Sequence, residues 1–431
     1  MERYESYKDS GVEWIGEIPR EWGVNRVGNV FTQRNETVSD KDYPALSVTK
    51  RGVVPQLENV AKTSHNDNRK LVLKGDFVIN SRSDRKGSSG TSEFDGSVSV
   101  INMILRPRGI HGKYSHYLFR SYEFVEEFFR FGKGIVWDLW STRFSEMKGI
   151  TIPVPSPCEQ EQIVEFLDRK TTLIDSLIEK TEKRIELLKE KRTSLINQVV
   201  TKGLNPDVEM KDSGVEWIGD IPGHWSVAKL KFIIQSLESG TSVNSDGRPV
   251  ENESEIGVLK TGCVSTGVFV STENKKVSEF DLSRVSCPVE KDVVIVNRAN
   301  SPELVGSCGY VSEDYPNLYL SDKLWKTVLN RAEKVVPLWL SYVLGSEYFL
   351  QEVSSVSTGT SPSMKNVSKE DYLNLSIPRC SYVEQEGIVH HLNEQTSTID
   401  STITTEEKRI ELLKEYRQSL ISEVVTGKVK V

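Results

Sequence analysis

Two stretches of the chain carry a heptad pattern of apolar residues. In residues 174–199 and 399–424 the apolar positions are spaced alternately by four and three, while the other positions are rich in Glu, Lys and Arg. This pattern, kept for about three and a half repeats, predicts a coiled-coil seam on each of two helices. The predicted seam positions are Ile174, Ile178, Ile185, Leu188, Arg192, Leu195, Ile399, Ile403, Ile410, Leu413, Arg417 and Leu420.

Helix-start signals precede both seams. Ser156 and Ser381 each stand three residues before a Glu, as in a capping box, and Gly203 and Gly427 can end the helices. Because polar seam residues specify register, Arg192 and Arg417 at equivalent layers favour a defined partner. We expect the two helices to pair with each other within one chain, as an antiparallel pair. The alternatives are that each helix packs on its own domain or pairs with another copy of the chain.

The regions between these helices alternate β-rich runs with amphipathic stretches. Strands are predicted near 71–73, 77–79 and 293–296, and helices over 111–131 and 337–353. Each region closes with a short apolar run that ends in a proline, at Pro153 and Pro378. This composition is typical of a mixed α/β domain.

The sequence contains an internal duplication. KDSGVEWIGEIP at residues 8–19 returns as KDSGVEWIGDIP at 211–222, and EKRIELLKE at 182–190 is identical at 407–415. The blocks between these repeats share little, which indicates one framework that presents two different surfaces; the alternative is an old duplication whose loops drifted. We therefore predict an α+β fold with internal pseudo-twofold duplication: two mixed α/β domains separated by a pair of long antiparallel coiled-coil helices. The expected boundaries are 1–156, 157–203, 204–222, 223–380 and 381–431.

Charge is distributed unevenly. The whole chain has a formal net charge of −7. Residues 20–152 contain 21 Lys and Arg against 15 Asp and Glu, a net charge of +6, whereas residues 223–377 contain 15 against 19, a net charge of −4. The first block has the electrostatic footprint of a nucleic-acid-binding domain, and the second does not. The five cysteines form no CxxC pair, and we expect a reduced, cytoplasmic protein without a zinc site.

Polar loops at strand ends are the candidate DNA contacts. Arg can bond guanine in a bidentate fashion, Asn can bond adenine, and Lys or Ser can hold phosphate. Any single residue of this set could equally be part of a solvated surface loop. Trp137 and Trp140 could contact bases or lie in the core. The predicted DNA-binding residues are Lys50, Arg51, Asn80, Arg82, Arg85, Lys86, Arg143, Lys260, Asn297, Arg298, Asn300 and Lys365.

Catalytic motifs are missing from the sequence. Residues 257–262 have the glycine spacing of a phosphate loop, but Cys263 stands where Lys is needed. The chain has no HExxH, no GxGxxG and no Asp/Asn-Pro-Pro-aromatic signature of amino-group DNA methyltransferases. We expect a non-catalytic protein that binds no cofactor or metal itself.

These duplicated motifs, with the EQxxI start and the VVT end of each long helix, resemble the specificity subunit of type I restriction–modification systems over essentially the whole chain. The resemblance implies two target recognition domains, each reading one half of a bipartite DNA target. It also implies partners: two modification subunits that methylate adenine and ATP-dependent restriction subunits. S-adenosylmethionine, ATP and magnesium would be bound by those partners. No membrane association is expected.

Two other functions remain open at this point. A non-DNA-binding coiled-coil scaffold would have no need for Arg- and Asn-rich loops, and a self-sufficient DNA methyltransferase would transfer methyl groups alone. If the helices set the gap between half-sites, inserting four residues between Thr201 and Lys211 is expected to change that gap by about one or two base pairs.

Overall fold

The computed structural model describes residues 2–56, 67–134, 140–361 and 363–431. The chain divides into two compact units: unit 1 comprises residues 1–182 and 406–431, and unit 2 comprises residues 183–405. Each unit therefore contains one globular block together with a part of each long helix, α5 (Pro157–Lys202) and α10 (Tyr382–Val425).

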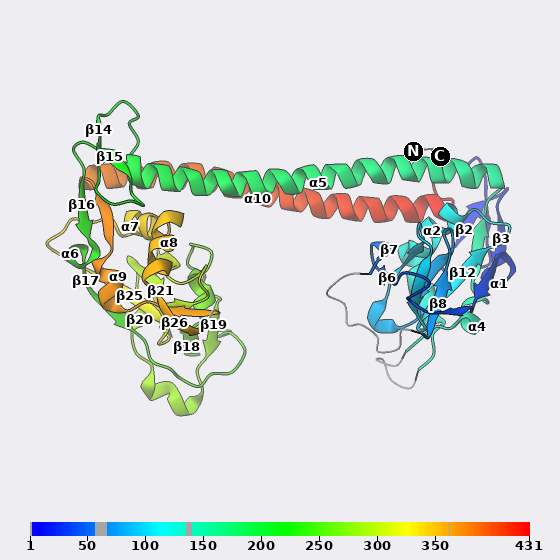
Figure 1. The fold of residues 1–431 in the computed structure, drawn as a ribbon, viewed down its shortest axis with the longest axis horizontal. Helices are drawn as coiled ribbons and strands as arrows, with labels where there is room; N and C mark the ends of the chain where they lie inside the picture. Colours follow the sequence, from blue (N-terminus) through cyan, green and yellow to red (C-terminus); the bar gives the residue numbers. More distant parts are fainter. Residues whose placement is uncertain (1, 57–66, 135–139, 362) are drawn as a thin grey trace. The chain divides into compact units, whose positions relative to one another are not determined.

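The largest sheet in the described part of unit 1 has four antiparallel strands in the order β10-β9-β12-β4. Figure 1 shows its strand β12 among the other elements of this unit. Its elements up to the middle of the block are β1 (Tyr7–Asp9), β2 (Glu17–Pro19), β3 (Gly23–Arg26), α1 (Val27–Val30), β4 (Phe31–Arg34), β5 (Thr37–Val38), β6 (Leu46–Thr49), β7 (Gly52–Pro55), β8 (Arg69–Val72) and β9 (Phe77–Asn80). The remaining elements before α5 are η1 (Ser83–Arg85), β10 (Ser89–Thr91), β11 (Gly96–Ser99), β12 (Asn102–Pro107), α2 (Gly112–Arg120), α3 (Tyr122–Arg130), α4 (Phe144–Met147) and β13 (Thr151–Val154).

Unit 2 repeats this topology with the sheet order β17-β25-β21-β23. Its first elements are β14 (Met210–Asp212), β15 (Asp220–Pro222), β16 (Ser226–Lys229), α6 (Leu230–Ile233), β17 (Ile234–Ser239), β18 (Gly257–Leu259), η3 (Thr261–Val264), β19 (Asn274–Lys276), η4 (Glu279–Arg284) and β20 (Pro288–Val289). The others are β21 (Val293–Asn297), β22 (Ala299–Asn300), β23 (Cys308–Val311), β24 (Tyr315–Tyr319), β25 (Leu324–Leu329), α7 (Pro337–Leu344), α8 (Glu347–Val356), β26 (Thr358–Ser361), β27 (Met364–Asn366), α9 (Lys369–Asn374) and β28 (Ser376–Arg379).

The predicted mixed α/β fold with internal duplication is confirmed. The closing strands pair in the same way in both units, β13 with β3 and β28 with β16. The short repeated motif forms the same hairpin twice, β1 with β2 and β14 with β15. The framework is thus duplicated in structure as well as in sequence.

The predicted helices at 111–131 and 337–353 are each two helices. Ser121 separates α2 from α3, and Ser346 separates α7 from α8; both serines have extended backbone angles. The Ser121 hydroxyl accepts a hydrogen bond from the Phe124 N–H, as an N-cap does. A serine inside an amphipathic stretch can start a new helix without altering the apolar pattern, which is why periodicity missed the break.

The two long helices run antiparallel in each unit. In unit 1 the Tyr114 hydroxyl lies 3.1 Å from the carbonyl oxygen of Pro153, just before α5, and 3.2 Å from that of Val425, at the end of α10. In unit 2 the Trp225 ring lies against Gly203, at the end of α5, and its Nε1 donates to Glu384 at the start of α10. Pairing within one chain is therefore observed.

Every predicted seam position is buried or half-buried. Ile174, Ile185 and Leu420 are among the buried residues, whereas Leu187 and Leu412, off the seam, are more than half exposed. The seam cations have acidic partners: Arg417 pairs with Asp175 in unit 1 at 2.9 Å. In unit 2 Arg192 pairs with Asp400 at 3.0 Å, and this is the equivalent pair under the 225-residue repeat.

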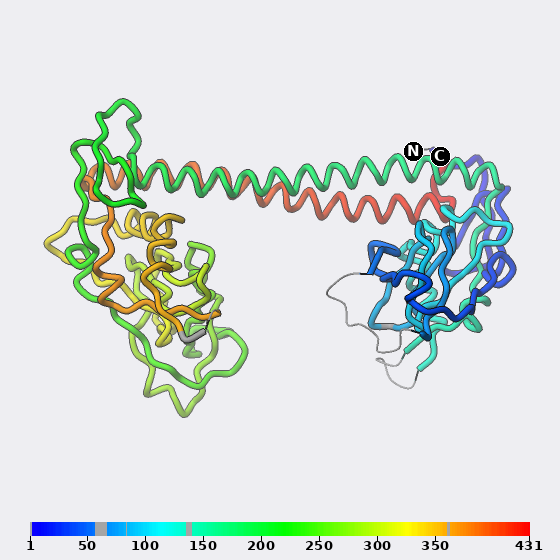
Figure 2. Tube along the Cα trace, viewed as in Figure 1, coloured from blue at the N-terminus to red at the C-terminus, as the bar shows by residue number. Residues whose placement is uncertain are grey.

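The two ends of the chain meet in unit 1, as Figure 2 shows. The Lys430 N–H donates to the Glu2 carbonyl oxygen at 2.9 Å. Of the helices built from described residues, none is both long enough and apolar enough to span a membrane.

Candidate nucleic-acid interface

The tip of the β6–β7 hairpin and the loop after β9 carry the candidate contacts of unit 1. Lys50 and Arg51 are exposed at the hairpin turn, and together with Lys86 they line a cavity of about 820 Å³ beside α5 and α10. Lys86 pairs with Glu126 at 2.7 Å and lies 4.6 Å from the centre of the Phe129 ring. The fold therefore brings together cations from separate parts of the sequence.

Arg82 is the most available cation at the end of β9. Its side chain is exposed, and its loop is fixed because the Thr142 N–H donates to the Ser81 carbonyl oxygen at 3.0 Å. Arg85 and Arg143 are also exposed, although Arg85 lies 3.6 Å from the neighbouring Asp84. An exposed guanidinium on an anchored loop is the arrangement that base recognition requires.

Trp140 packs within unit 1. Its Nε1 donates to the Phe129 carbonyl oxygen at 2.9 Å, and its ring lies over Phe129. Trp140 thus packs against Phe129 and supports the loop that carries Arg82. Trp137, the other tryptophan considered for base contact, lies outside the described residues.

The candidate contacts of unit 2 gather where β21 ends. Asn300 on β22 is the register partner of Lys365 on β27, and the Arg298 carbonyl oxygen accepts the Val367 N–H at 3.0 Å. Arg298 is half-buried, and its Nε has no hydrogen-bond partner among the described residues. This Nε is itself buried from solvent, so its lack of a partner does not make it a ligand contact.

The two lysines of this group are held within the protein. Lys260 lies 3.8 Å from Glu273, and the Lys365 ammonium donates to the Ser354 carbonyl oxygen at 2.7 Å. Of the three predicted DNA-contacting cations of unit 2, Arg298 is therefore the one whose side chain makes no ion pair or hydrogen bond among the described residues.

Two asparagines predicted to contact DNA are buried instead. Asn297 is 0% exposed, and its Nδ2 lies 3.4 Å from the Thr261 carbonyl oxygen. Asn80 is 9% exposed, and its Oδ1 accepts the Arg82 N–H at 3.1 Å. These side chains stabilise the strand ends that carry Arg82 and Arg298, so the prediction of base contact is wrong for both. Sequence could not separate a loop asparagine from the last residue of a buried strand.

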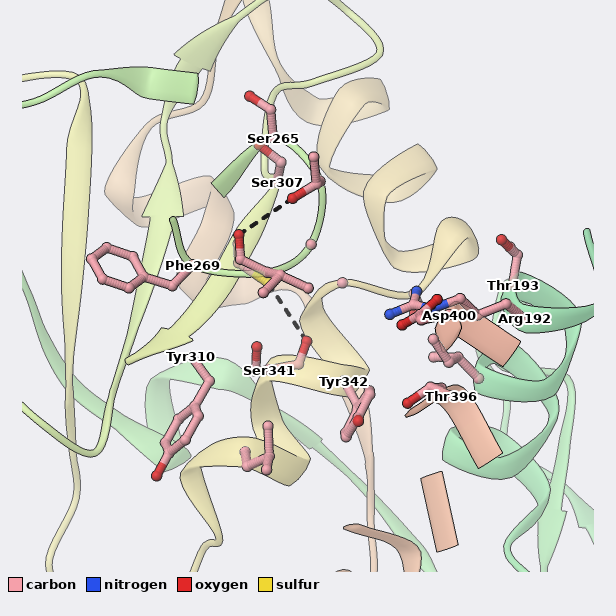
Figure 3. Close-up of a pocket in the computed structure, with 18 of the residues that line it drawn as sticks. Arg192, Thr193, Ser265, Phe269, Ser307, Tyr310, Ser341, Tyr342, Thr396 and Asp400 are labelled. Atoms are coloured by element: carbon pink, nitrogen blue, oxygen red, sulfur yellow. Dashed lines mark hydrogen bonds and ion pairs between the residues drawn. The ribbon is translucent and has the colours of Figure 1, made fainter. Parts of the chain in front are cut away.

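A second cavity lies in unit 2, between α7 and the helix segments of that unit (Figure 3). Its volume is about 980 Å³. Hydroxyl groups line much of it, and the Cys308 thiol donates to the Ser341 carbonyl oxygen at 3.5 Å. No cluster of metal-binding side chains occurs within the part of the chain that the structure describes.

The globular block of each unit is attached to a long helix by a buried glutamine. Gln160 accepts the His111 N–H at 2.8 Å and donates to the Pro155 carbonyl oxygen, and Gln385 does the same for Val336 and Cys380. Tyrosines add a second attachment: Tyr117 donates to Asp168. The repeated EQ motif thus positions the globular block of each unit on its helix.

Hydrogen bonds at the start of α10 keep Glu384 ionised. Burial alone would raise its pKa, but bonds from His224, Trp225 and Ser381 outweigh that effect and lower the pKa to about 2. A charged Glu384 therefore ties the repeated Trp225 motif to α10 over the ordinary pH range.

The comparisons with known proteins agree with this architecture. A family model described as type I restriction modification DNA specificity domain matches residues 19–187. The specificity subunit of the type I restriction enzyme MjaVIII from Methanocaldococcus jannaschii is 24% identical, over 96% of this chain and 94% of that protein. The EcoKI specificity subunit from Escherichia coli is 24% identical, over 65% of this chain and 58% of that protein.

Two solved structures share the fold. One chain, from a study of complex assembly and conformational transition of the type I R-M system, has a TM-score of 0.71 at 14% identity and covers 96% of this chain and 99% of its own. The HsdS subunit from Thermoanaerobacter tengcongensis has a TM-score of 0.54 at 15% identity, with coverage of 96% and 98%. The duplicated framework and the paired helices of this chain are thus similar to those of type I restriction enzyme specificity subunits, and a DNA specificity domain model of that family matches residues 19–187.

Proposed function

We propose that this chain is the DNA-reading subunit of a type I restriction–modification complex and recognises a bipartite target. The observation that carries the proposal is the duplication. The same sheet, hairpin and glutamine attachment occur in both units, while the surface loops that these elements support differ. One framework that presents two unlike surfaces suits a target made of two unlike half-sites.

Unit 1 reads one half-site through the Arg82 loop, and unit 2 reads the other through the Arg298 loop. Both arginines follow a buried strand of the main sheet, β9 or β21. Because these loops are anchored by backbone hydrogen bonds, little conformational entropy is lost when DNA binds.

The long helices set the distance between the half-sites and provide the docking surface for two modification subunits. Unit 1 and unit 2 are connected only through α5 and α10, since both boundaries between units fall inside these helices. The seam cations Arg192 and Arg417 and their aspartate partners fix the register of that pair.

The chemistry belongs to the partners. S-adenosylmethionine would be bound by the modification subunits, and ATP and magnesium by restriction subunits. The specificity subunit itself would be non-catalytic and would contribute sequence recognition and geometry.

Sequencing of a bound DNA pool tests this function. The full chain, assembled with its modification subunits, is mixed with random-sequence duplex DNA, and the retained fraction is sequenced. Two short conserved blocks at a constant separation are expected. Absence of any enriched sequence would favour a protein-binding scaffold, and a single uninterrupted block would contradict reading by two units.

A further inference from the structure

Two of the cavities beside the long helices, one in each unit, occupy equivalent places in the duplicated framework. Arg417 and Asp175 line the unit 1 cavity, and their repeat equivalents Arg192 and Asp400 line the unit 2 cavity. The positions are equivalent, but the charges around them are not, and this difference bears on how each unit holds DNA.

The unit 1 cavity has an excess of cations. Three acidic residues line it, and one of them, Asp175, is already paired with Arg417. Among the described residues, Lys50, Arg51, Arg120 and Lys414 have no ion-pair partner within 4 Å. The cations that line the cavity are Lys50, Arg51, Lys86, Arg120, Lys414 and Arg417.

Arg120 is held by groups that leave its charge uncompensated. One Nη donates to the Lys50 carbonyl oxygen at 2.6 Å, and the other lies 3.0 Å from His116 Nε2. Burial, and next the charge of Arg417, lower the pKa of Arg120. The protein therefore stabilises this cation poorly, and an anion in the cavity would stabilise it.

His116 cannot accept hydrogen bonds from both of the N–H groups that approach it. The Thr91 N–H donates to Nδ1 at 3.1 Å while Arg120 approaches Nε2. Burial and the nearby Arg120 lower the pKa of His116 to about 3, so the ring is neutral and offers one acceptor nitrogen. The competition leaves an N–H of Arg120 available to another acceptor.

The unit 2 cavity lacks these features. Gly345 occupies the place of Arg120, and Thr404 that of Glu179. Among the described residues that line it, Arg192 is the only Lys or Arg, and it is paired with Asp400 (Figure 3). Serine, threonine and tyrosine hydroxyls replace the cations, so this cavity has no excess of positive charge.

We propose that the unit 1 cavity is a phosphate site, in which Lys50, Arg51, Arg120 and Lys414 hold a backbone phosphate of DNA. The inference deepens the proposed function and rests on it. The guanidinium groups would supply paired N–H donors to the phosphate oxygens, and the lysines would supply point charges. Unit 2 would hold its half-site without an equivalent phosphate contact, so the two halves of the target would be bound with unequal dependence on salt.

Exchange of Lys414 for glutamine tests the site. Lys414 is exposed, so Lys414→Gln leaves the fold intact, and Lys189→Gln is a matched control because Lys189 occupies the equivalent helix position in unit 2. DNA binding by the full chain with its modification subunits is measured against salt concentration. Lys414→Gln should weaken binding several-fold for every sequence and reduce the slope of log K against log salt by about 1, while Lys189→Gln leaves the slope unchanged. Equal slopes for both variants would overturn the proposal.

A second measurement separates failure of the site from failure of the proposed function. Inorganic phosphate should raise the unfolding temperature of the wild-type chain and have a smaller effect on Arg51→Gln. If DNA is not bound but phosphate still stabilises the wild type alone, the site stands and the DNA-reading function falls. If Lys414→Gln instead weakens assembly with the modification subunits and leaves the salt slope unchanged, the cavity takes an acidic protein segment and the phosphate proposal is wrong.

Discussion

Gly203 and Gly427 each have two structural roles in this chain. Each ends a long helix with a positive φ, and each lies against the tryptophan of the repeated hairpin motif, Trp225 or Trp22. Both glycines were predicted as helix stops from their place after the last apolar residue. That they also seat a buried indole could not be predicted, because the contact joins parts of the chain far apart in sequence.

Gly427→Ala separates these two roles. A methyl group there would overlap Pro19 and come within 3.0 Å of Trp22 Cζ3, whereas Gly11, at a similar positive φ, has no atom within 4 Å of an added methyl. Gly11→Ala is expected to cost about 1–2 kcal/mol from backbone strain, and Gly427→Ala about 1–3 kcal/mol more from overpacking. Urea unfolding of both variants measures the difference in their free energies of unfolding. Equal losses of stability would show that the contact of Gly427 with Pro19 and Trp22 is not tightly packed.

His116 makes unit 1 sensitive to mild acid. Its pKa is lowered to about 3 in the folded protein, so the unfolded chain takes up a proton first as the pH falls below about 6.5. Folding stability should therefore fall between pH 6.5 and 3, by about 2 kcal/mol at pH 5. His116→Gln should flatten the pH dependence of unfolding over that range, with the exposed His390→Gln as control; an unchanged profile would contradict the assignment.

At the scale of elements, the spacing of apolar residues predicted the two long helices and their seam. It did not predict the acidic partners of the seam arginines. The four–three alternation identified the buried stripe because a coiled coil must repeat its contacts every heptad. The aspartates that pair with Arg192 and Arg417 lie beside the seam, and only the antiparallel arrangement brings them within reach. The polar loops were located correctly at strand ends, whereas burial of Asn80 and Asn297 depends on packing that spacing does not encode.

The attachment of α2 to α5 depends on Gln160. Gln160→Leu would leave the His111 N–H and the Pro155 carbonyl oxygen buried without partners, at a cost of about 2–5 kcal/mol. Hydrogen exchange of the His111 amide should accelerate, and unfolding in urea should begin earlier. The control substitution Gln162→Leu, at an exposed position, should change neither the exchange rate of the His111 amide nor the urea concentration at which unfolding begins. Protection of His111 unchanged in Gln160→Leu would refute the attachment.

At the scale of the whole molecule, the connections between units determine which insertion can change the spacing. Residues 204–209 follow Gly203 and precede β14 within unit 2, so they do not connect one unit to the other. Added residues there would be accommodated by the loop at little cost. The expectation that an insertion between Thr201 and Lys211 changes the gap therefore does not follow from this structure.

Lengthening both helices is the appropriate change. Seven residues inserted after Glu182 and seven after Thr405 would keep the heptad register and add about 10 Å to each helix. The preferred gap between half-sites should grow by about three base pairs, with the half-site sequences unchanged. Sequencing of bound DNA measures both. A constant gap would show that the helices do not set the spacing, and seven residues added within the loop 204–209 serve as the control.

Mapping of adenine methylation in cells that express the complete system tests the central claim most directly. The wild-type chain should give one motif of two specific half-sites around a fixed gap. Arg82→Ala should relax the specificity of one half-site, by about 1–3 kcal/mol at a single position, and Arg298→Ala should relax only the other. If one of these substitutions relaxes the specificity of both half-sites, or if it relaxes neither half-site, the two units do not read DNA independently and the account is wrong.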